Sequence, residues 1–523
     1  MLLKKGFFPS KHHPQRKELV WTAKAKALML MAVALHLLIV IVAGLVVLTL
    51  RSGADNFFTA VILAALVFLP FYFVLFSIAL LAIKPLDAYA KNRLVSKARA
   101  KIKGLSQPIN RLTTSGQTNL GGLVIIGVAG SYGKTTMKEV LGQALGARFK
   151  VLGTPESVNT PVGIARWILN KVDESTEIII VEMGEHYEND IKEICEIAKP
   201  DIAVVTGINE SHLERMKTMD TVISTVFEIV SNSKPGATVV LNADDRNVME
   251  NYKKFVWPDH KIERFSAGGG SASGGKIEDL RLRHFNSEKL CWEAEFENIG
   301  KIEIGLLGEY ALGDVEAAVK IGKFLGMSNE QIIAGIKNIK PVEHRLEPIK
   351  SAANVLVIDD SYNGNPDGAA EAIRVLSRFS DRRKIYITPG LVEMGKSSAD
   401  IHRAIGKQLA GVADVVILIK NSVTGFIEEG INTTPSRFAV HPSLAGGEAP
   451  QLSSDNRGLS DEALAKSEAS PPNIGGVPRA AGGGGIPTII RFNSAPEAHA
   501  GLKDILKPGD VILFQNDWGD QYV

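Results

Sequence analysis

Gly127-Val-Ala-Gly-Ser-Tyr-Gly-Lys-Thr-Thr136 is the stretch that decides the fold. The short apolar run Leu123–Gly127 leads into it and is typical of a buried strand, and a helical pattern begins near Lys134. A glycine-rich turn between a strand and a helix lets backbone N–H groups converge on phosphate oxygens, while the helix N-terminus adds the positive end of its dipole. The stretch therefore predicts a phosphate-binding loop in an α/β domain.

Two side chains of this loop carry the expected chemistry. Lys134 would reach the terminal phosphates of a nucleotide, and the Thr135 hydroxyl would ligate magnesium, which makes ATP and Mg²⁺ the predicted ligands. Five residues separate Gly127 from Gly133, so the ordinary Walker spacing is not met from Gly127. A chance glycine turn is the alternative, and the flanking strand and helix argue against it.

Two further apolar runs end in polar side chains. The run Glu177–Gly184 carries Glu182, at the place where nucleotide-binding sheets hold a magnesium ligand. The run Asp201–Gly207 is followed by His212, a predicted second metal ligand or acid/base group. Taken alone, His212 could equally be a capping or core histidine, and its position after the loop and Glu182 favours function.

The N-terminal region has a different character. The runs Ala27–Leu50 and Phe57–Ile83 are apolar and each exceeds the ~20 residues that a helix needs to cross a bilayer. Lys and Arg gather before and after the two runs, against a lone Arg51 between them. We therefore expect a two-helix transmembrane hairpin with both ends in the cytoplasm, a multi-pass location in the cell membrane, and membrane lipid as a partner.

Length and composition indicate several domains, since 523 residues exceed what one hydrophobic core supports. The two cysteines lie far apart, so neither a disulfide framework nor a zinc site is expected. No nucleic-acid partner is expected. The predicted organisation is a basic cytoplasmic N-terminus (1–26), the hairpin (27–83), a basic linker (84–121), an ATP-binding parallel-sheet domain (122–342) with a small antiparallel appendage, and a Rossmann-like domain (343–523) with a disordered Gly/Ser/Ala/Pro-rich insert (442–485).

Several motifs in fixed order resemble the Mur ligases over about residues 122–523. After the loop come Glu182-Met-Gly184, His212-Leu-Glu214 and Leu241-Asn-Ala-Asp-Asp245. The next domain continues with Asp359-Asp-Ser-Tyr-Asn-Gly-Asn-Pro-Asp367 and Gly390-Leu-Val-Glu-Met-Gly395. The first of these two runs looks most like the branch that adds D-alanyl-D-alanine to a UDP-muramoyl tripeptide.

The resemblance implies a chemistry and a set of residues. ATP would phosphorylate a substrate carboxylate to an acyl phosphate, and an amine would attack it to form an amide. Lys134, Glu182 and His212 would be catalytic, and magnesium would be held by Thr135, Glu182 and His212. The implied nucleotide-binding residues are Gly130, Ser131, Gly133, Lys134, Thr135, Thr136, Asn159, Arg345, Asp360, Tyr362, Asn363 and Asn365. For the last five, Arg345 to Asn365, turn chemistry is the alternative explanation.

The sequence also departs from the family pattern. Val226 stands where the family has a lysine, often carbamylated, that orients a second magnesium. Tyr310-Ala311 replaces a His-Asn pair, Asp314 replaces a later Asn, and Gln515-Asn-Asp-Trp518 replaces a Lys-Gly-Ser-Arg run. The predicted substrates are a small-molecule or lipid-linked cell-wall precursor and a D-amino-acid dipeptide or another amine. A related amide ligase and a nucleotide-binding regulator without catalysis remain alternatives.

Overall fold

The protein is described by a computed structural model in two units, one over residues 9–100 and the other comprising 1–8 and 101–523. The structure describes the isolated positions 30, 33, 34, 37, 41 and 42, and residues 72–106, 122–155, 158–185, 187–209, 213–267, 280–297, 299–351, 353–362, 364–392, 394–434 and 486–515. Two predicted site residues, His212 and Asn363, lie outside this set, as do the predicted insert 442–485 and residues 107–121 of the predicted linker.

The first helix described at length is α3 (Tyr72–Leu105). It includes the end of the second apolar run but continues through Pro85 into a basic stretch with Lys84, Arg93 and Lys97 exposed. In the described part of the chain, none of the helices combines the length and the apolar character needed to cross a bilayer. The predicted multi-pass membrane location is wrong by this finding. Residues 57–71 and all but six residues of 27–50 lie outside the described residues.

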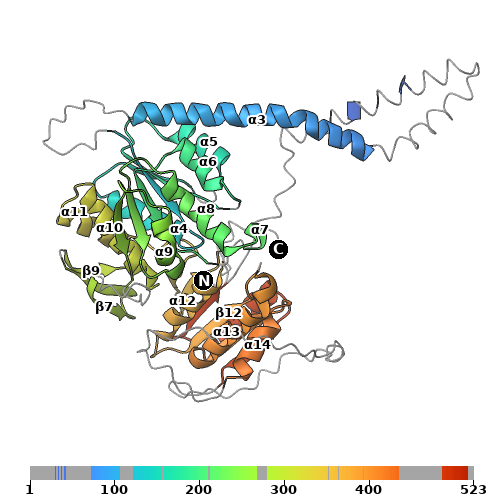
Figure 1. The fold of residues 1–523 in the computed structure, drawn as a ribbon. Coiled ribbons are helices and arrows are strands. Elements are labelled where there is room, and N and C mark those ends of the chain that lie inside the picture. The colour runs from blue at the N-terminus through green and yellow to red at the C-terminus, as the bar shows by residue number, and fades with distance from the viewer. Residues whose placement is uncertain are drawn as a thin grey trace, which may run out of the picture. The chain divides into compact units, whose positions relative to one another are not determined.

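The first sheet is parallel throughout, as the sequence predicts (Figure 1). Its strand order is β2-β3-β1-β4-β5-β6, and the central strands are apolar and buried because helices cover both faces. The strands are β1 (Val124–Ala129), β2 (Val151–Gly153), β3 (Ile178–Glu182), β4 (Ile202–Val205), β5 (Thr238–Asn242) and β6 (Lys261–Phe265).

The helix that follows the predicted loop, α4, packs with α10 and α11 in one core (Figure 1). On the opposite face α8 contacts β1, where Ile229 approaches Gly127. The helices and turns of this part are α4 (Lys134–Leu145), α5 (Pro161–Lys171), α6 (Asp190–Ile197), α7 (Leu213–Met216), α8 (Met219–Ser231), α9 (Arg246–Asn251), η3 (Tyr252–Lys254), α10 (Tyr310–Phe324) and α11 (Asn329–Lys337).

The predicted antiparallel appendage is confirmed as a three-stranded sheet of β7 (Leu280–Asn286), β8 (Cys291–Phe296) and β9 (Gly300–Ile304). Its strands alternate in burial, so that Trp292, Ala294 and Phe296 enter the same core as α4 and α10. Trp292 also donates a hydrogen bond from its indole nitrogen to the Leu307 carbonyl at 3.1 Å. The appendage is therefore fixed to the helices that cover the first sheet.

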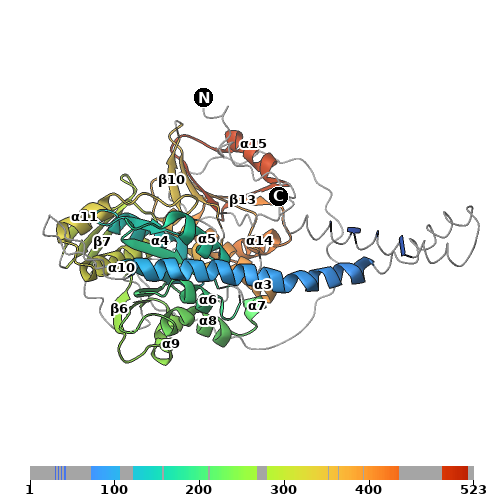
Figure 2. The same ribbon diagram turned by 90° about the horizontal axis from the view of Figure 1, so that it is seen from above.

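The second sheet has the order β10-β11-β15-β12-β13-β14, with β10 antiparallel to β11 and the other pairs parallel (Figure 2). The last strand, β15, returns between β11 and β12, and such a reversal of strand order opens a crevice at the carboxyl ends of the strands. The elements are β10 (Glu347–Lys350), β11 (Leu356–Asp360), α12 (Pro366–Ser377), β12 (Lys384–Thr388), η4 (Gly395–Ser397), α13 (Ser398–Val412), β13 (Val415–Ile419), α14 (Thr424–Asn432), β14 (Thr488–Phe492), α15 (Ala495–Ile505) and β15 (Val511–Gln515). The α/β, Rossmann-like expectation is confirmed for these described strands.

The contact between α11 and α4 gives a stability prediction. A Cβ at position 335 would lie 2.2 Å from the Ala144 carbonyl oxygen. A Cβ at position 425 in α14 would have no described atom within 4 Å outside its own helix backbone. We expect Gly335→Ala to lower the free energy of unfolding by about 1–3 kcal/mol through overpacking. Gly425→Ala should leave it unchanged or raise it by up to about 1 kcal/mol. Urea denaturation measures both, and equal effects would contradict the close packing of α11 on α4.

Candidate nucleotide-binding site

The phosphate loop turns tightly against the end of β4. Gly130 has φ 147° and Gly133 has φ 78°, backbone conformations that residues with a Cβ rarely adopt. A Cβ at Gly130 would also lie 2.2 Å from Thr206 Oγ1. The Ser131 N–H donates to the Gly207 carbonyl at 2.7 Å, and Thr206 Oγ1 donates to the Tyr132 carbonyl. Gly130 is therefore required by its close approach to the neighbouring strand, and Gly133 by its positive φ.

Tyr132 anchors the middle of the loop, a role that the sequence did not indicate. Its hydroxyl donates to Asp245 Oδ2 at 2.8 Å, and a Cβ at Gly207 would meet the Tyr132 ring. Asp245 also accepts from the Ile208 N–H at 3.0 Å and, as the cap of α9, from the Val248 N–H at 2.8 Å. Burial, followed by the charge of Asp245, raises the pKa of Tyr132, so the hydroxyl stays a donor at neutral pH.

Lys134 is the first residue of α4, and its side chain is largely buried. Its ammonium contacts both carboxylate oxygens of Glu185, at 2.8 and 2.9 Å, and also donates to the Gly130 carbonyl. Glu185 is 1% exposed, and its burial raises the pKa of the carboxyl more than the adjacent Lys134 lowers it. Sequence reasoning missed Glu185, which lies three residues beyond the predicted ligand Glu182.

Thr135 and Glu182 lie together, as a magnesium site requires. Thr135 Oγ1 is 3.2 Å from Glu182 Oε1, and the other carboxylate oxygen is 3.1 Å from the ammonium of Lys138. Lys138 is 1% exposed and also donates to the Thr154 carbonyl at 2.8 Å. Two hard oxygen donors side by side fit the coordination preference of Mg²⁺. Thr136, the next residue, is buried.

Two more predicted residues border the same site. Ser131 Oγ is buried and has no hydrogen-bond partner in the described structure, as expected of a hydroxyl that donates to a ligand oxygen. Asn159 contacts the end of β3, where its carbonyl accepts from the Gly184 N–H at 3.1 Å. The structure thus brings the predicted loop residues, Glu182 and Asn159 together.

A second group of predicted residues lies at the carboxyl end of β11. The Arg345 guanidinium stacks over the Tyr362 ring at 4.9 Å. Asp360 accepts from the Leu346 N–H at 3.2 Å, and burial raises its pKa to about 7 although the charge of Arg345 lowers it. Asn365 caps α12 by accepting from the Gly368 N–H at 2.9 Å, which is the turn role that the sequence left open.

Asp367, in the first turn of α12, accepts a hydrogen bond from the Asn209 side chain at 2.8 Å. Asn209 lies in the segment after β4, so this contact joins the α12 N-terminus to the segment that the phosphate loop contacts. The motif after β11 and the loop after β1 therefore belong to the same region of the second unit.

Three of the residues at which the sequence was expected to depart from the family pattern are buried in the structure. Val226 is fully buried in α8, so the position is part of the core. Gln515 is 1% exposed and accepts from the Tyr386 and Thr388 hydroxyls at 3.2 Å each. Asp314 is buried, which raises its pKa well above the ordinary value, and its Oδ2 has no partner among the residues described.

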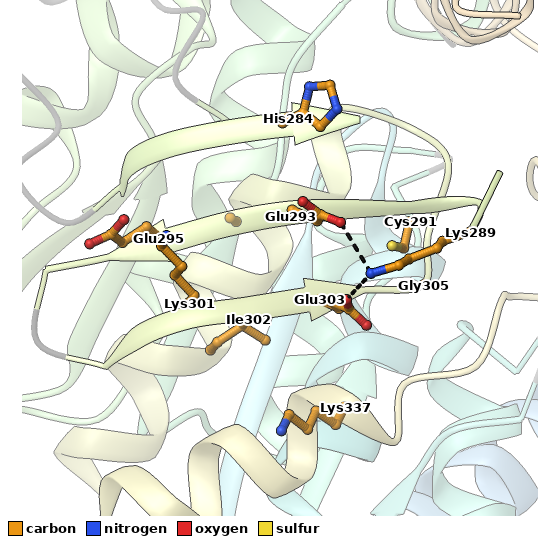
Figure 3. Close-up of a pocket in the computed structure, with 11 residues that line it drawn as sticks. His284, Lys289, Cys291, Glu293, Glu295, Lys301, Ile302, Glu303, Gly305 and Lys337 are labelled. Carbon is orange, nitrogen blue, oxygen red and sulfur yellow. Dashed lines mark hydrogen bonds and ion pairs between the residues drawn. The ribbon is translucent and has the colours of Figure 1, made fainter. Parts of the chain in front are cut away.

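A cavity of about 1070 Å³ lies elsewhere, on the appendage and beside α11 (Figure 3). In its lining, the Lys289 ammonium lies 3.3 Å from a Glu293 carboxylate oxygen and 2.6 Å from a Glu303 carboxylate oxygen. Its lining mixes both charges and includes no residue of the phosphate loop. The cavity is therefore separate from the candidate nucleotide-binding chemistry.

The fold and the site are those of α/β proteins that bind a nucleoside triphosphate at a loop between a parallel strand and a helix. Residues 128–321 match the Mur ligase middle domain, and residues 344–515 match the family's C-terminal model, described as the Mur ligase, glutamate ligase domain. These matches cover more than half of the chain. The chain belongs to the Mur ligase family, whose members are ATP-dependent ligases that form peptide bonds and bind ATP with Mg²⁺.

Two curated proteins with similar sequences carry the name of one ligase. The chain is 26% identical over 75% of its length to a UDP-N-acetylmuramoyl-tripeptide–D-alanyl-D-alanine ligase of Mycobacterium tuberculosis (strain CDC 1551 / Oshkosh), of which it covers 70%. It is 26% identical over 59% of its length to the ligase of that name from Bacillus subtilis (strain 168), of which it covers 65%, less than two thirds.

Solved structures share the fold. The MurF ligase of Thermotoga maritima in complex with ADP has a TM-score of 0.59 and 22% identity, covering 82% of this chain and 81% of that one. A MurF structure from Acinetobacter baumannii has a TM-score of 0.61 and 20% identity, covering 82% and 78%. At this identity the likeness establishes the architecture alone.

The Tyr132 anchor gives a second prediction. Tyr132→Phe removes the hydroxyl and leaves a buried Asp245 oxygen with one donor fewer, so we expect the free energy of unfolding to fall by about 1–3 kcal/mol. Tyr187→Phe is the control, because that side chain is 62% exposed. Urea denaturation of both variants measures the difference. A Tyr132→Phe protein as stable as the control would show that the anchor contributes nothing.

Asp360 gives a prediction about pH. Its pKa in the folded protein is about 7, above the ~3.9 of an unfolded chain, so between these values the native state binds the proton and the unfolded state does not. Stability due to this group therefore falls as pH rises through the window, by at most about 1.4 kcal/mol per pH unit. Asp360→Asn should remove that slope. Denaturation of both proteins from pH 4.5 to 7.5 measures it, and parallel pH profiles would refute the assignment.

Proposed function

We propose that the chain joins the amino group of D-alanyl-D-alanine to a carboxylate of a UDP-N-acetylmuramoyl tripeptide, with cleavage of ATP to ADP and phosphate. The observation that carries the proposal is the joint placement of Lys134, Thr135 and Glu182 in one phosphate site. The substrates are suggested by the names of the relatives and by the Asp359–Asp367 run after β11.

The first step transfers the γ-phosphoryl group. A carboxylate oxygen of the tripeptide attacks the γ-phosphorus, the bond to the β-phosphate oxygen breaks, and ADP leaves. The N–H groups of the loop and the Lys134 ammonium hold the phosphate oxygens and offset the charge that they carry. Mg²⁺, held by Thr135 and Glu182, would supply further positive charge at these oxygens when bound.

The second step forms the amide. The dipeptide amine attacks the acyl carbon, the tetrahedral intermediate loses phosphate by breaking the carbon–oxygen bond, and the nitrogen gives up a proton. Asn159 lies beside Gly184, close to the strand end that carries Glu182, and is proposed to orient the reacting groups there. Arg345, Asp360 and Tyr362 are proposed to close on the nucleotide from the second sheet. His212 and Asn363 remain predicted site residues outside the described chain.

A nucleotide-binding regulator without catalysis is the second candidate. The fully buried Val226 favours it, because an apolar side chain at this position in α8 cannot orient a second magnesium ion. This candidate predicts ATP binding without release of phosphate in the presence of both substrates. The ligase predicts phosphate release that depends on both.

Lys134→Ala tests the proposal directly. We expect phosphate release and amide formation to fall by at least 10²-fold, because the loop loses the cation that offsets the charge of the transferred group. Lys171→Ala, at an exposed position at the end of α5, is the control and should keep wild-type turnover. Phosphate release is followed with the muramoyl tripeptide and the dipeptide, and mass spectrometry identifies the product. Activity retained by Lys134→Ala would refute the proposed mechanism.

A further inference from the structure

The ammonium of Lys134 is fully engaged inside the protein. A lysine has three N–H donors, and here the contacts are two carboxylate oxygens of Glu185 and the carbonyl of Gly130. The side chain is 14% exposed, so water has little access to replace these partners. No donor of this ammonium is left over for a phosphate oxygen.

Glu185 is held in place by its surroundings as well as by Lys134. It is 1% exposed and follows Gly184, whose N–H is bonded to the Asn159 carbonyl. A carboxylate with so little access to water needs a partner, because leaving a buried charge unpaired is costly. Lys134 is the cation that the described structure gives it.

The neighbouring ion pair has a different arrangement. Lys138 is also 1% exposed and contacts Glu182, but its other contacts are the Thr154 carbonyl and Glu139. It lies one turn further into α4 and takes no part in the loop. Lys138 can therefore keep Glu182 in place while a nucleotide is bound, whereas Lys134 cannot keep all its contacts with Glu185 and also bind a phosphate.

We propose that Glu185 is an internal competitor for the phosphate-binding lysine: its carboxylate occupies the ammonium of Lys134 in the nucleotide-free protein, and ATP binds by taking over that ammonium. The proposal rests on the proposed nucleotide site. Binding then includes the cost of breaking a buried ion pair and of bringing phosphate charge close to a carboxylate. The apparent affinity for ATP is correspondingly lower than the loop alone would give.

Glu185→Gln tests the competition, because glutamine keeps the size and one acceptor but removes the charge. Without metal, in EDTA, we expect the variant to bind ATP at least about tenfold more tightly than wild type, in line with the coupling energies of close buried charge pairs. Inorganic triphosphate should show the same gain, since the competition concerns the phosphates alone. Calorimetry measures both dissociation constants.

Glu139→Gln is the matched control. Glu139 lies on the same helix, is 45% exposed and is 3.5 Å from the Lys138 ammonium, so its removal reports the effect of one less negative charge near the loop. We expect its affinity to stay within about twofold of wild type. Thermal unfolding checks that each variant is folded. Should Glu185→Gln not fold, Glu185→Asp decides, since the shorter carboxylate cannot reach Lys134 with both oxygens and should give a smaller gain.

The outcomes separate the two proposals. Wild-type protein that binds ATP, with a Glu185→Gln variant that binds ATP and triphosphate equally or more weakly, would overturn the competition. A gain of the same size in Glu139→Gln would overturn it too, because the effect would then be one of overall charge. Failure of every folded variant, wild type included, to bind ATP would instead refute the nucleotide site itself.

Discussion

The contact between the phosphate loop and the end of β4 is the constraint on which the site depends. Because β1 and β4 are adjacent parallel strands, the turns that follow them lie at the same edge of the sheet, and here they contact each other. Gly130 and Gly207 make that approach possible, and the Thr206 hydroxyl and the Gly207 carbonyl then hold the turn by hydrogen bonds. The start of α4 is fixed by the same contacts, and so is the direction in which Lys134 leaves the helix.

Charge balance is the second constraint. Two lysines on successive turns of α4 face two glutamates that follow or end β3, and three of these four residues are almost fully buried. Removing one member of such a pair leaves an uncompensated buried charge, which is strongly destabilising. The site can therefore accept a polyanion and a divalent cation only if the internal pairs are rearranged or shared. The phosphate loop is thus joined to the end of β3 by ion pairs and to the end of β4 by hydrogen bonds.

The sequence predicted those parts of the fold and site that depend on local pattern. The run before Gly127 and the run ending in Glu182 are apolar throughout, which is typical of central parallel strands, so the meeting of Thr135 and Glu182 could be anticipated. Glu185 and the Tyr132–Asp245 pair could not, because their partners lie 51 and 113 residues away and depend on side-chain packing. The predicted membrane location is wrong because an apolar run alone does not define a membrane-spanning helix: the helix that contains the end of the second run continues into basic residues.

Gln515, at the end of β15, stands where the resemblance implies a lysine, and a neutral residue at this position has consequences for the local electrostatics. Gln515 pairs in register with Asp360, and its amide oxygen accepts from Tyr386 and Thr388. A lysine there would place a positive charge beside Asp360 and lower its pKa, whereas the neutral amide leaves Arg345 as the cation that acts on it. Asp360 therefore keeps a pKa near 7 and can hold or release a proton at neutral pH. An anion that engaged Arg345 would weaken the lowering effect of this cation on the pKa of Asp360, so the carboxyl would hold its proton more readily.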